Sequence, residues 1–185
     1  MDTHIACTIE PFDEKDIDLL ISWIDSEEML MQFSGPGFHF PLTRQQILLN
    51  RNDEHRYTYK IVVIPANLVI GYAEIYLQEE KTVILSRIII GERSYRGKGL
   101  CKQILNRLLE ISFKFFGAEK AILNVFDWNI QAIRCYKNAG FAINEGKFKQ
   151  RELKDETWTV LQMTLEKKDW RNPISNNSFS RDNPD

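Results

Sequence analysis

The chain has 185 residues, of which 43% are hydrophobic and 27% are charged, and its formal net charge is −2 at pH 7. This length fits one domain whose core buries most of its apolar surface, and the composition is ordinary for a soluble globular protein. A nucleic-acid or polyanion partner requires a clustered basic surface, and a membrane span requires a long apolar run. We therefore expect neither a nucleic-acid nor a membrane partner.

The first strand is expected over residues 4–10. A helix follows over residues 13–33, where apolar side chains recur at helical spacing. The break at residues 35–37, Gly-Pro-Gly, precedes Thr43-Arg44-Gln45-Gln46, which resembles a capping box and predicts a short helix.

The middle of the chain is rich in β-branched and aromatic residues. Residues 57–64 and 68–77 predict a hairpin around Pro65-Ala66-Asn67, and residues 81–90 predict a third strand of the same kind. A strongly amphipathic helix is expected over residues 97–116.

The last predicted elements are a strand over residues 120–126, a helix over residues 129–138 and two strands over residues 141–150 and 157–165. Together the elements predict a mixed α/β domain with helices on both faces of one sheet. We assign residues 1–168 to this domain. Residues 169–185 are rich in Asn, Ser, Pro and Asp, and we expect a mobile polar tail there.

The three cysteines, Cys7, Cys101 and Cys135, are odd in number and show no close spacing such as C-x-x-C. This pattern favours reduced thiols over a disulfide framework. The first six residues have neither the basic cluster nor the apolar run of a secretion signal, so the expected location is the cytoplasm.

The most informative segment is residues 93–101, Arg-Ser-Tyr-Arg-Gly-Lys-Gly-Leu-Cys, between a strand and the long helix. A helix start leaves backbone N–H groups without partners and carries a partial positive charge. Gly97 and Gly99 let that backbone approach a ligand, while Arg93 and Arg96 add positive potential. An anionic group such as a pyrophosphate is expected to bind there.

Two familiar phosphate motifs fail at this turn. Gly91 and Gly97 have five residues between them where a P-loop has four, and Lys102 stands where a dinucleotide fingerprint needs its third glycine. A nucleotide-binding protein that prefers ATP or NAD remains one alternative.

A second motif lies in residues 129–141, which read N-x-x-A-x-x-x-Y-x-x-x-G-F. With the Arg96-x-x-Gly99 turn before it, this pattern resembles the GNAT superfamily of acetyl-CoA-dependent acetyltransferases. The resemblance is firm over residues 84–145. It implies a GNAT-like acyl-CoA N-acyltransferase fold, with a mixed, mostly antiparallel sheet of about seven strands.

The resemblance also implies where acetyl-CoA binds. The backbone around the glycine-rich turn would hold the pyrophosphate, through Arg96, Gly97, Lys98, Gly99, Leu100 and Cys101. The strand residues Ile88, Ile89 and Ile90 would pair with the pantetheine arm, and Asn129 would hydrogen-bond it. The family usually has Gly or Ala where this chain has Cys101.

The implied activity is transfer of an acetyl group to a primary amine, on a small molecule or a protein N-terminus, by direct attack in a ternary complex. Tyr136 would face the thioester sulfur and act as the acid. A non-catalytic domain that binds or senses acyl-CoA is the alternative. Dimers are common in this family, so both a monomer and a homodimer stay open.

The general base has several candidates. Glu74, on a strand expected beside the cofactor strand, is the candidate base; its alternative is an exposed polar position on an alternating strand. His39 and Glu28 are weaker candidates. Some relatives carry an acid where this chain has Ser86 and Arg87, which leaves a base that acts through water open.

The residues expected to shape the acceptor site lie in the N-terminal region. Glu10-Pro11-Phe12 with Trp23, and residues 40–43, loosely resemble the branch that acetylates ribosomal-protein N-termini and polyamines. The loop over residues 35–40 is the expected wall of the site. The histidines show no metal-binding spacing, so no metal is expected.

Overall fold

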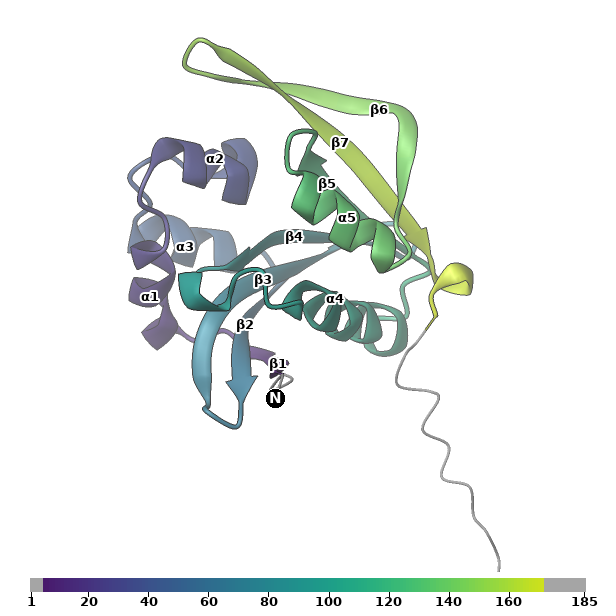
Figure 1. Ribbon diagram of the computed structural model, residues 1–185, viewed down its shortest axis with the longest axis horizontal. Coiled ribbons are helices and arrows are strands. Elements are labelled where there is room, and N and C mark those ends of the chain that lie inside the picture. Colours follow the sequence, from purple (N-terminus) through teal and green to yellow (C-terminus); the bar gives the residue numbers. More distant parts are fainter. Residues whose placement is uncertain (1–4, 172–185) are drawn as a thin grey trace, which may run out of the picture.

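The computed structural model of the protein describes residues 5–171. They form a seven-stranded sheet with helices packed on both of its faces (Figure 1). The helices and strands in chain order are β1 (Ala6–Pro11), α1 (Ile17–Ser22), α2 (Glu27–Ser34), α3 (Arg44–Arg51), β2 (Arg56–Ile64), β3 (Leu68–Gln78), β4 (Thr82–Ile90), α4 (Leu100–Glu110), β5 (Lys120–Phe126), α5 (Ile130–Asn138), β6 (Ala142–Leu153) and β7 (Glu156–Glu166).

The strand order is β1-β2-β3-β4-β5-β7-β6. Within the described residues each neighbouring pair is antiparallel except β4 and β5, which are parallel. The predicted mixed, mostly antiparallel sheet is therefore confirmed.

The sheet separates two hydrophobic cores. Successive residues of a strand point to opposite faces, and β3 contributes to both cores. Ala73 and Ile75 lie in the larger core with α4, whereas Tyr72 lies in the smaller core with the apolar residues of α1, α2 and α3. Tyr72 packs edge-on against Phe12, with 4.8 Å between ring centroids.

The parallel strands β4 and β5 stay paired for only part of their length. Their register runs from Thr82 opposite Lys120 to Leu85 opposite Leu123, and no pairing follows. β4 continues to Ile90 and β5 to Phe126, so the two strands separate and leave an opening in the sheet.

A β-bulge lies at the point where β4 leaves β5. Tyr72 pairs with Ile89 and Glu74 with Ser86, so Arg87 and Ile88 together face the one residue between them on β3. Arg87 has a φ of 49°, in the left-handed region that a side chain rarely adopts. Bulges of this kind commonly lie next to active sites, where they redirect a side chain.

Two predicted helices differ from the structure. The helix expected over residues 13–33 is divided, because Ser26 caps a new helix, α2, through a hydrogen bond from the Met29 N–H. The helix expected over residues 97–116 begins at Leu100, since Gly99 has a φ of 74° and cannot continue a right-handed helix backwards.

The end of the described chain packs onto the domain. Trp170 lies within the range expected to be a mobile tail, yet its ring centroid is 5.4 Å from that of Phe113 in the larger core. The remainder of the expected tail, residues 172–185, lies outside the described residues.

Candidate active site

A cleft of 770 Å³ occupies the opening between β4 and β5. Its walls come from β4, β5, the start of α4 and α5, with α2 and the following loop at one end. Most of the predicted cofactor residues line it, namely Ile88, Ile89, Ile90, Arg96, Gly97, Gly99, Leu100, Cys101, Asn129 and Tyr136. Lys98 is exposed beside the cleft and does not line it.

The start of α4 forms one end of the cleft. Gly97 and Gly99 both have positive φ values, 72° and 74°, and a side-chain carbon at either position would meet no atom within 4 Å. Arg96 donates hydrogen bonds from Nε to the Ile90 carbonyl (2.7 Å) and from Nη2 to the Gly91 carbonyl (3.2 Å). The arginine fixes the turn, which keeps the first N–H groups of α4 open to an anion.

The free edge of β4 forms the side of the cleft. β3 pairs with the other edge through Gly71 opposite Ile90 and Tyr72 opposite Ile89. Beyond Leu85, β4 has no partner on the β5 side. An extended chain of amides could hydrogen-bond to such an edge as an added strand does.

Two residues of α5 face the cleft from the opposite side. Asn129 caps the helix, because its Oδ1 accepts a hydrogen bond from the Ala132 N–H at 3.2 Å. Tyr136, two turns later, is half-buried against the larger core, and burial raises the pKa of its hydroxyl to about 12. The hydroxyl therefore stays protonated at neutral pH and is able to donate a proton or a hydrogen bond.

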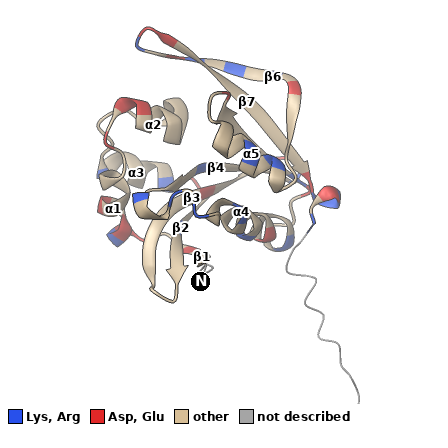
Figure 2. Ribbon diagram, viewed as in Figure 1, with Lys and Arg blue, Asp and Glu red and all other residues tan. Residues whose placement is uncertain are grey.

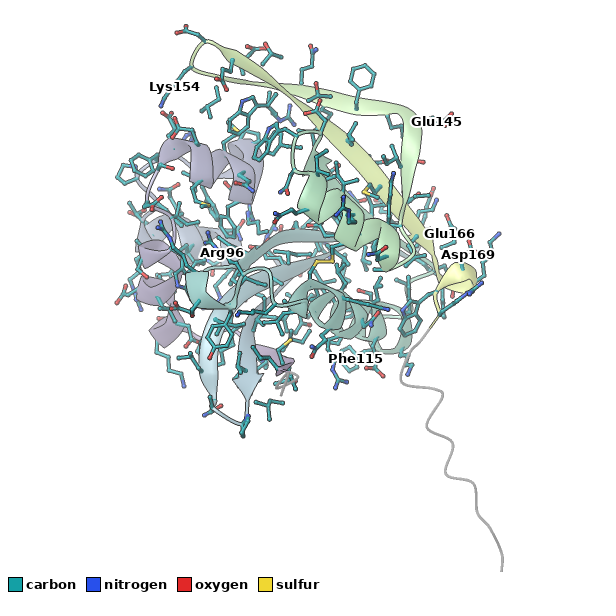
Figure 3. All side chains as sticks on the ribbon, in the orientation of Figure 1. Arg96, Phe115, Glu145, Lys154, Glu166 and Asp169 are labelled. Carbon is teal, nitrogen blue, oxygen red and sulfur yellow. A yellow bond between two sulfur atoms is a disulfide. The ribbon has the colours of Figure 1, made fainter. Side chains whose placement is uncertain are left out.

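The expectation of reduced thiols is wrong for two of the three cysteines. Cys101 and Cys135 form a disulfide between α4 and α5, with 6.4 Å between their Cα atoms (Figure 3). They are 34 residues apart, so local spacing does not reveal the pair. Cys7 is free and buried, and burial raises the pKa of its thiol.

Glu74 is neither in the wall of the cleft nor exposed to solvent. Its side chain is fully buried, which rules out the exposed alternative. Its two oxygens accept hydrogen bonds from five side chains of the surrounding strands and α3, namely Asn50 (3.2 Å), Arg56 (2.6 Å), Tyr72 (2.7 Å), Ser86 (3.5 Å) and Arg87 (2.7 Å). The carboxylate holds this group together from beneath the cleft.

The weaker base candidates lie apart from the predicted cofactor residues. His39 is exposed and its backbone N–H donates to Gln46 Oε1 at 2.8 Å. Glu28, in the acidic first turn of α2 (Figure 2), forms an ion pair with Lys154. The hydrogen bond from Lys154 lowers the pKa of Glu28. Lys154 lies at the tip of the β6–β7 hairpin, which thus contacts α2 (Figure 3).

The predicted loop over residues 35–40 contributes to the site in two ways. Gly35 and Pro36 line the cleft. Phe38 is buried, and its ring lies 4.4 Å from the guanidinium carbon of Arg87, a cation–π contact.

Sequence reasoning missed the arginines at this end of the cleft. Arg56 and Arg87 both line it, and each donates from Nη1 to Glu74 Oε2. A signal for part of this network is visible in the sequence, since Glu74 and Arg87 are the single charged residues of two strongly apolar strands. A charge in such a place requires a partner of opposite sign.

The described part of the chain shows neither a membrane-spanning helix nor a cluster of metal ligands. None of the helices between residues 5 and 171 is long and apolar enough to cross a membrane. Within the same residues, no three His, Cys, Asp or Glu side chains are grouped as metal ligands.

Comparison with protein families gives one match over most of the chain. The model of the acetyltransferase (GNAT) family matches residues 19–141. The spermine/spermidine N(1)-acetyltransferase of Bacillus subtilis (strain 168) is 40% identical over 62 residues, which are 34% of this chain and 40% of that protein. The match thus spans two fifths of the length of this curated relative.

Solved structures share the fold. The spermidine N-acetyltransferase of Vibrio cholerae, solved in complex with CoA and spermine, superposes with a TM-score of 0.75 at 18% identity. The superposition covers 88% of this chain and 96% of that one. A chimera of the Vibrio cholerae enzyme with hSSAT gives a TM-score of 0.72 over 86% of this chain and 95% of that one, also at 18% identity.

Proposed function

Because the chain belongs to the GNAT acetyltransferase family, we propose that it transfers the acetyl group of acetyl-CoA to a primary amine by direct attack in a ternary complex. The observation that carries this proposal is the opening between β4 and β5, which has the start of α4 at one end and Tyr136 beside it. Acetyl-CoA, when bound, supplies an acetyl group already activated as a thioester.

The residues present fit that co-substrate. Gly97, Gly99 and Leu100 at the start of α4 line the cleft, and the free N–H groups of a helix start carry the partial positive charge that favours a pyrophosphate. The free edge at Ile88, Ile89 and Ile90 presents backbone groups to the pantetheine amides. Asn129 uses its oxygen as a helix cap, which leaves its amide N–H groups to hydrogen-bond the same arm.

The chemistry requires a donor for the negative charge that develops on the acetyl oxygen and a proton for the departing thiolate. The bulge at Arg87 and Ile88 interrupts the regular pairing of β4 with β3, and a backbone N–H group of this segment would supply the donor. Tyr136 supplies the proton. Burial raises the pKa of its hydroxyl to about 12, so the hydroxyl is protonated at neutral pH.

The attacking amine must lose its own proton. No Asp or Glu is among the described residues that line the cleft. Water accepts this proton, or the acceptor enters as the free amine. Glu74 acts as a positioning residue, because its five donors occupy both oxygens and it lies beneath the cleft.

The disulfide supports direct transfer. Cys101 and Cys135 are the two sulfur nucleophiles of the cleft wall, and their bond to each other leaves neither as a thiolate. An acetyl-cysteine intermediate is therefore not part of the proposed mechanism.

The experiment is an assay of thiol release from acetyl-CoA with a panel of primary amines, with the acetylated product identified by mass. Release that depends on an amine, above the rate without any amine, is the expected result. Acetyl-CoA binding without amine-dependent release would contradict the proposal and favour a domain that only binds acyl-CoA.

A further inference from the structure

The side chains that line the cleft have one sign of charge. Five of them are cationic, and no carboxylate is among the described residues of the lining. The cations come from β2, β4, the turn before α4, and β6, and they are Arg56, Arg87, Arg96, Lys149 and Arg151. Because Arg96 is turned to the carbonyls at the end of β4, the others determine the charge of the remaining wall.

Arg87 is the best-placed of these groups. Its side chain is only 10% exposed. Its Nη1 donates to Glu74 Oε2 (2.7 Å) and to Asn50 Oδ1 (2.9 Å), and its Nε is buried without a partner. Its Nη2 has no hydrogen bond to any described residue, and it is not among the buried atoms. This nitrogen is the donor of Arg87 that no described residue uses and that is left for a ligand, and Arg87 lines the cleft.

The surroundings of Arg87 fix its direction. The backbone at Arg87 is held in the bulge, with a φ of 49°. Its guanidinium lies on the ring of Phe38 and against Gly37, where a side-chain carbon would come within 2.5 Å of Nη2. A planar guanidinium held in this way is preorganised to bind a carboxylate, with little side-chain entropy left to lose.

The excess positive charge of the lining comes from β6, because the group around Arg87 pairs two guanidinium groups, Arg56 and Arg87, with two carboxylates. Glu74 is a single carboxylate shared by two guanidinium groups. Asp53 lies 3.6 Å from Arg56 Nη2 and offsets part of the charge of Arg56 alone. Lys149 and Arg151 line the same cleft as Arg87 and form no ion pair among the described residues, so they give the cleft its excess positive charge.

This charge argues against a polyamine acceptor. When one amine of a polyamine is neutral and ready to attack, at least one further ammonium group keeps its charge. That ammonium would lie in a cleft lined by cations, where like charges in low dielectric repel strongly. An acceptor with a carboxylate in place of the second ammonium would be attracted instead.

We infer that the acceptor is a small primary amine that also carries a carboxylate, and that Arg87 binds this carboxylate with Arg56 beside it. This inference rests on the proposed acetyl transfer and narrows its substrate class. It differs from the polyamines named for the relatives above.

The test compares acceptors that differ only in the charge at the far end. The acceptors 6-aminohexanoate, 1-aminohexane and 1,6-diaminohexane share one chain length and a similar reactive amine, and the common amino acids with their amides extend the set. We expect kcat/KM for the best carboxylate-bearing amine to exceed that of its uncharged partner by about tenfold or more, because an unpaired arginine is left when the carboxylate is missing.

One substitution tests whether Arg87 causes the preference for a carboxylate-bearing acceptor. Arg87→Met should bring the ratio of kcat/KM between the carboxylate-bearing and uncharged acceptors close to one. Lys147→Met, which removes an exposed cation of β6 outside the cleft lining, should leave the ratio unchanged. If Arg87→Met does not fold, the kcat/KM ratios of the wild-type protein still show whether it prefers a carboxylate-bearing acceptor.

Failure of this inference and failure of the proposed acetyl transfer would give different results. Equal or faster acetylation of 1,6-diaminohexane or spermidine than of each carboxylate-bearing amine would overturn the inference and leave the proposed acetyl transfer standing. Absence of thiol release with every amine, in a protein that binds acetyl-CoA, would overturn the proposed function and this inference with it.

Discussion

Glu74 and Arg87 face each other across β3 and β4, with 2.7 Å between Glu74 Oε2 and Arg87 Nη1. The carboxylate is fully buried, and the same oxygen accepts from Arg56 at 2.6 Å. The bulge that contains Arg87 lies just beyond the point where β4 stops pairing with β5, at the side of the cleft. One buried ion pair thus links the stability of the sheet to the geometry of the candidate site.

Glu74→Gln should destabilise the protein by about 3–5 kcal/mol, because it leaves two buried guanidinium groups without their shared counter-charge. Chemical denaturation measures this change. The exposed Glu79→Gln on the turn after β3 is the control and should change stability by less than about 0.5 kcal/mol. A Glu74→Gln protein of unchanged stability would show that the carboxylate does not hold this group together.

Tyr136→Phe should reduce kcat by about a hundredfold or more, because the phenol is the proposed proton donor to the leaving thiolate. The KM for acetyl-CoA should change little, since the ring and its packing remain. Steady-state thiol release measures both constants. Tyr57→Phe removes an exposed hydroxyl that does not line the cleft and is the matched control. Unchanged turnover of Tyr136→Phe would remove this residue as the acid.

The dependence of kcat/KM on pH should show a rise and no fall over the range in which the protein is folded. The rise follows deprotonation of the acceptor ammonium, whose ordinary pKa is about 10. A fall would require ionisation of Tyr136, and burial has raised the pKa of that hydroxyl to about 12.

Two acceptors with different amine pKa values show whether the rise in kcat/KM comes from the acceptor ammonium or from a side-chain base. The midpoint should move with the pKa of the amine, because no described carboxylate of the cleft wall sets it. A midpoint near pH 6 or 7 that is the same for both acceptors would instead identify a side-chain base.

The Cys101–Cys135 disulfide should stabilise the domain by about 2–4 kcal/mol, since it closes a loop of moderate length in the unfolded chain. Dithiothreitol should therefore lower the melting temperature of the wild type. It should leave that of Cys135→Ser unchanged, because this variant has no bond to reduce. Two reactive thiols at Cys101 and Cys135 in the protein without reductant would contradict the pairing.

Much of the fold followed from local patterns in the sequence. The hairpin of β2 and β3, the strand β5 and the helix α5 lie where periodicity and turn residues predicted them, within one or two residues. Thr43 caps α3 as expected through the Gln46 N–H, although the Gln46 side chain bonds the backbone of His39 and Pro41 instead of closing the box.

The candidate site was only partly predictable. Glycines at a helix start and the pattern ending at Phe141 are each contiguous in the sequence, and they marked the part of the cleft where we propose that acetyl-CoA binds. The pair Glu74–Arg87 and the bridge Cys101–Cys135 join residues 13 and 34 positions apart. Such contacts depend on strand register, on a bulge and on the packing of two helices, which the local sequence does not specify.

The most direct test of the acetyl-CoA site is a thermal-shift titration of the wild type and Gly99→Glu with acetyl-CoA, beside ATP and NAD. A ligand that binds only the folded state stabilises it by about 2.7 kcal/mol at a hundred times its Kd. We predict that acetyl-CoA stabilises the wild type selectively and leaves Gly99→Glu unshifted, because the glutamate fills the phosphate site with bulk and negative charge.

Gly146→Glu is the matched control in that titration, since Gly146 also has a positive φ, 76°, and open space around it, on β6 outside the cleft lining. It should respond to acetyl-CoA as the wild type does. No shift of the wild type at millimolar acetyl-CoA, or an equal shift of Gly99→Glu, would contradict a cofactor site at the start of α4.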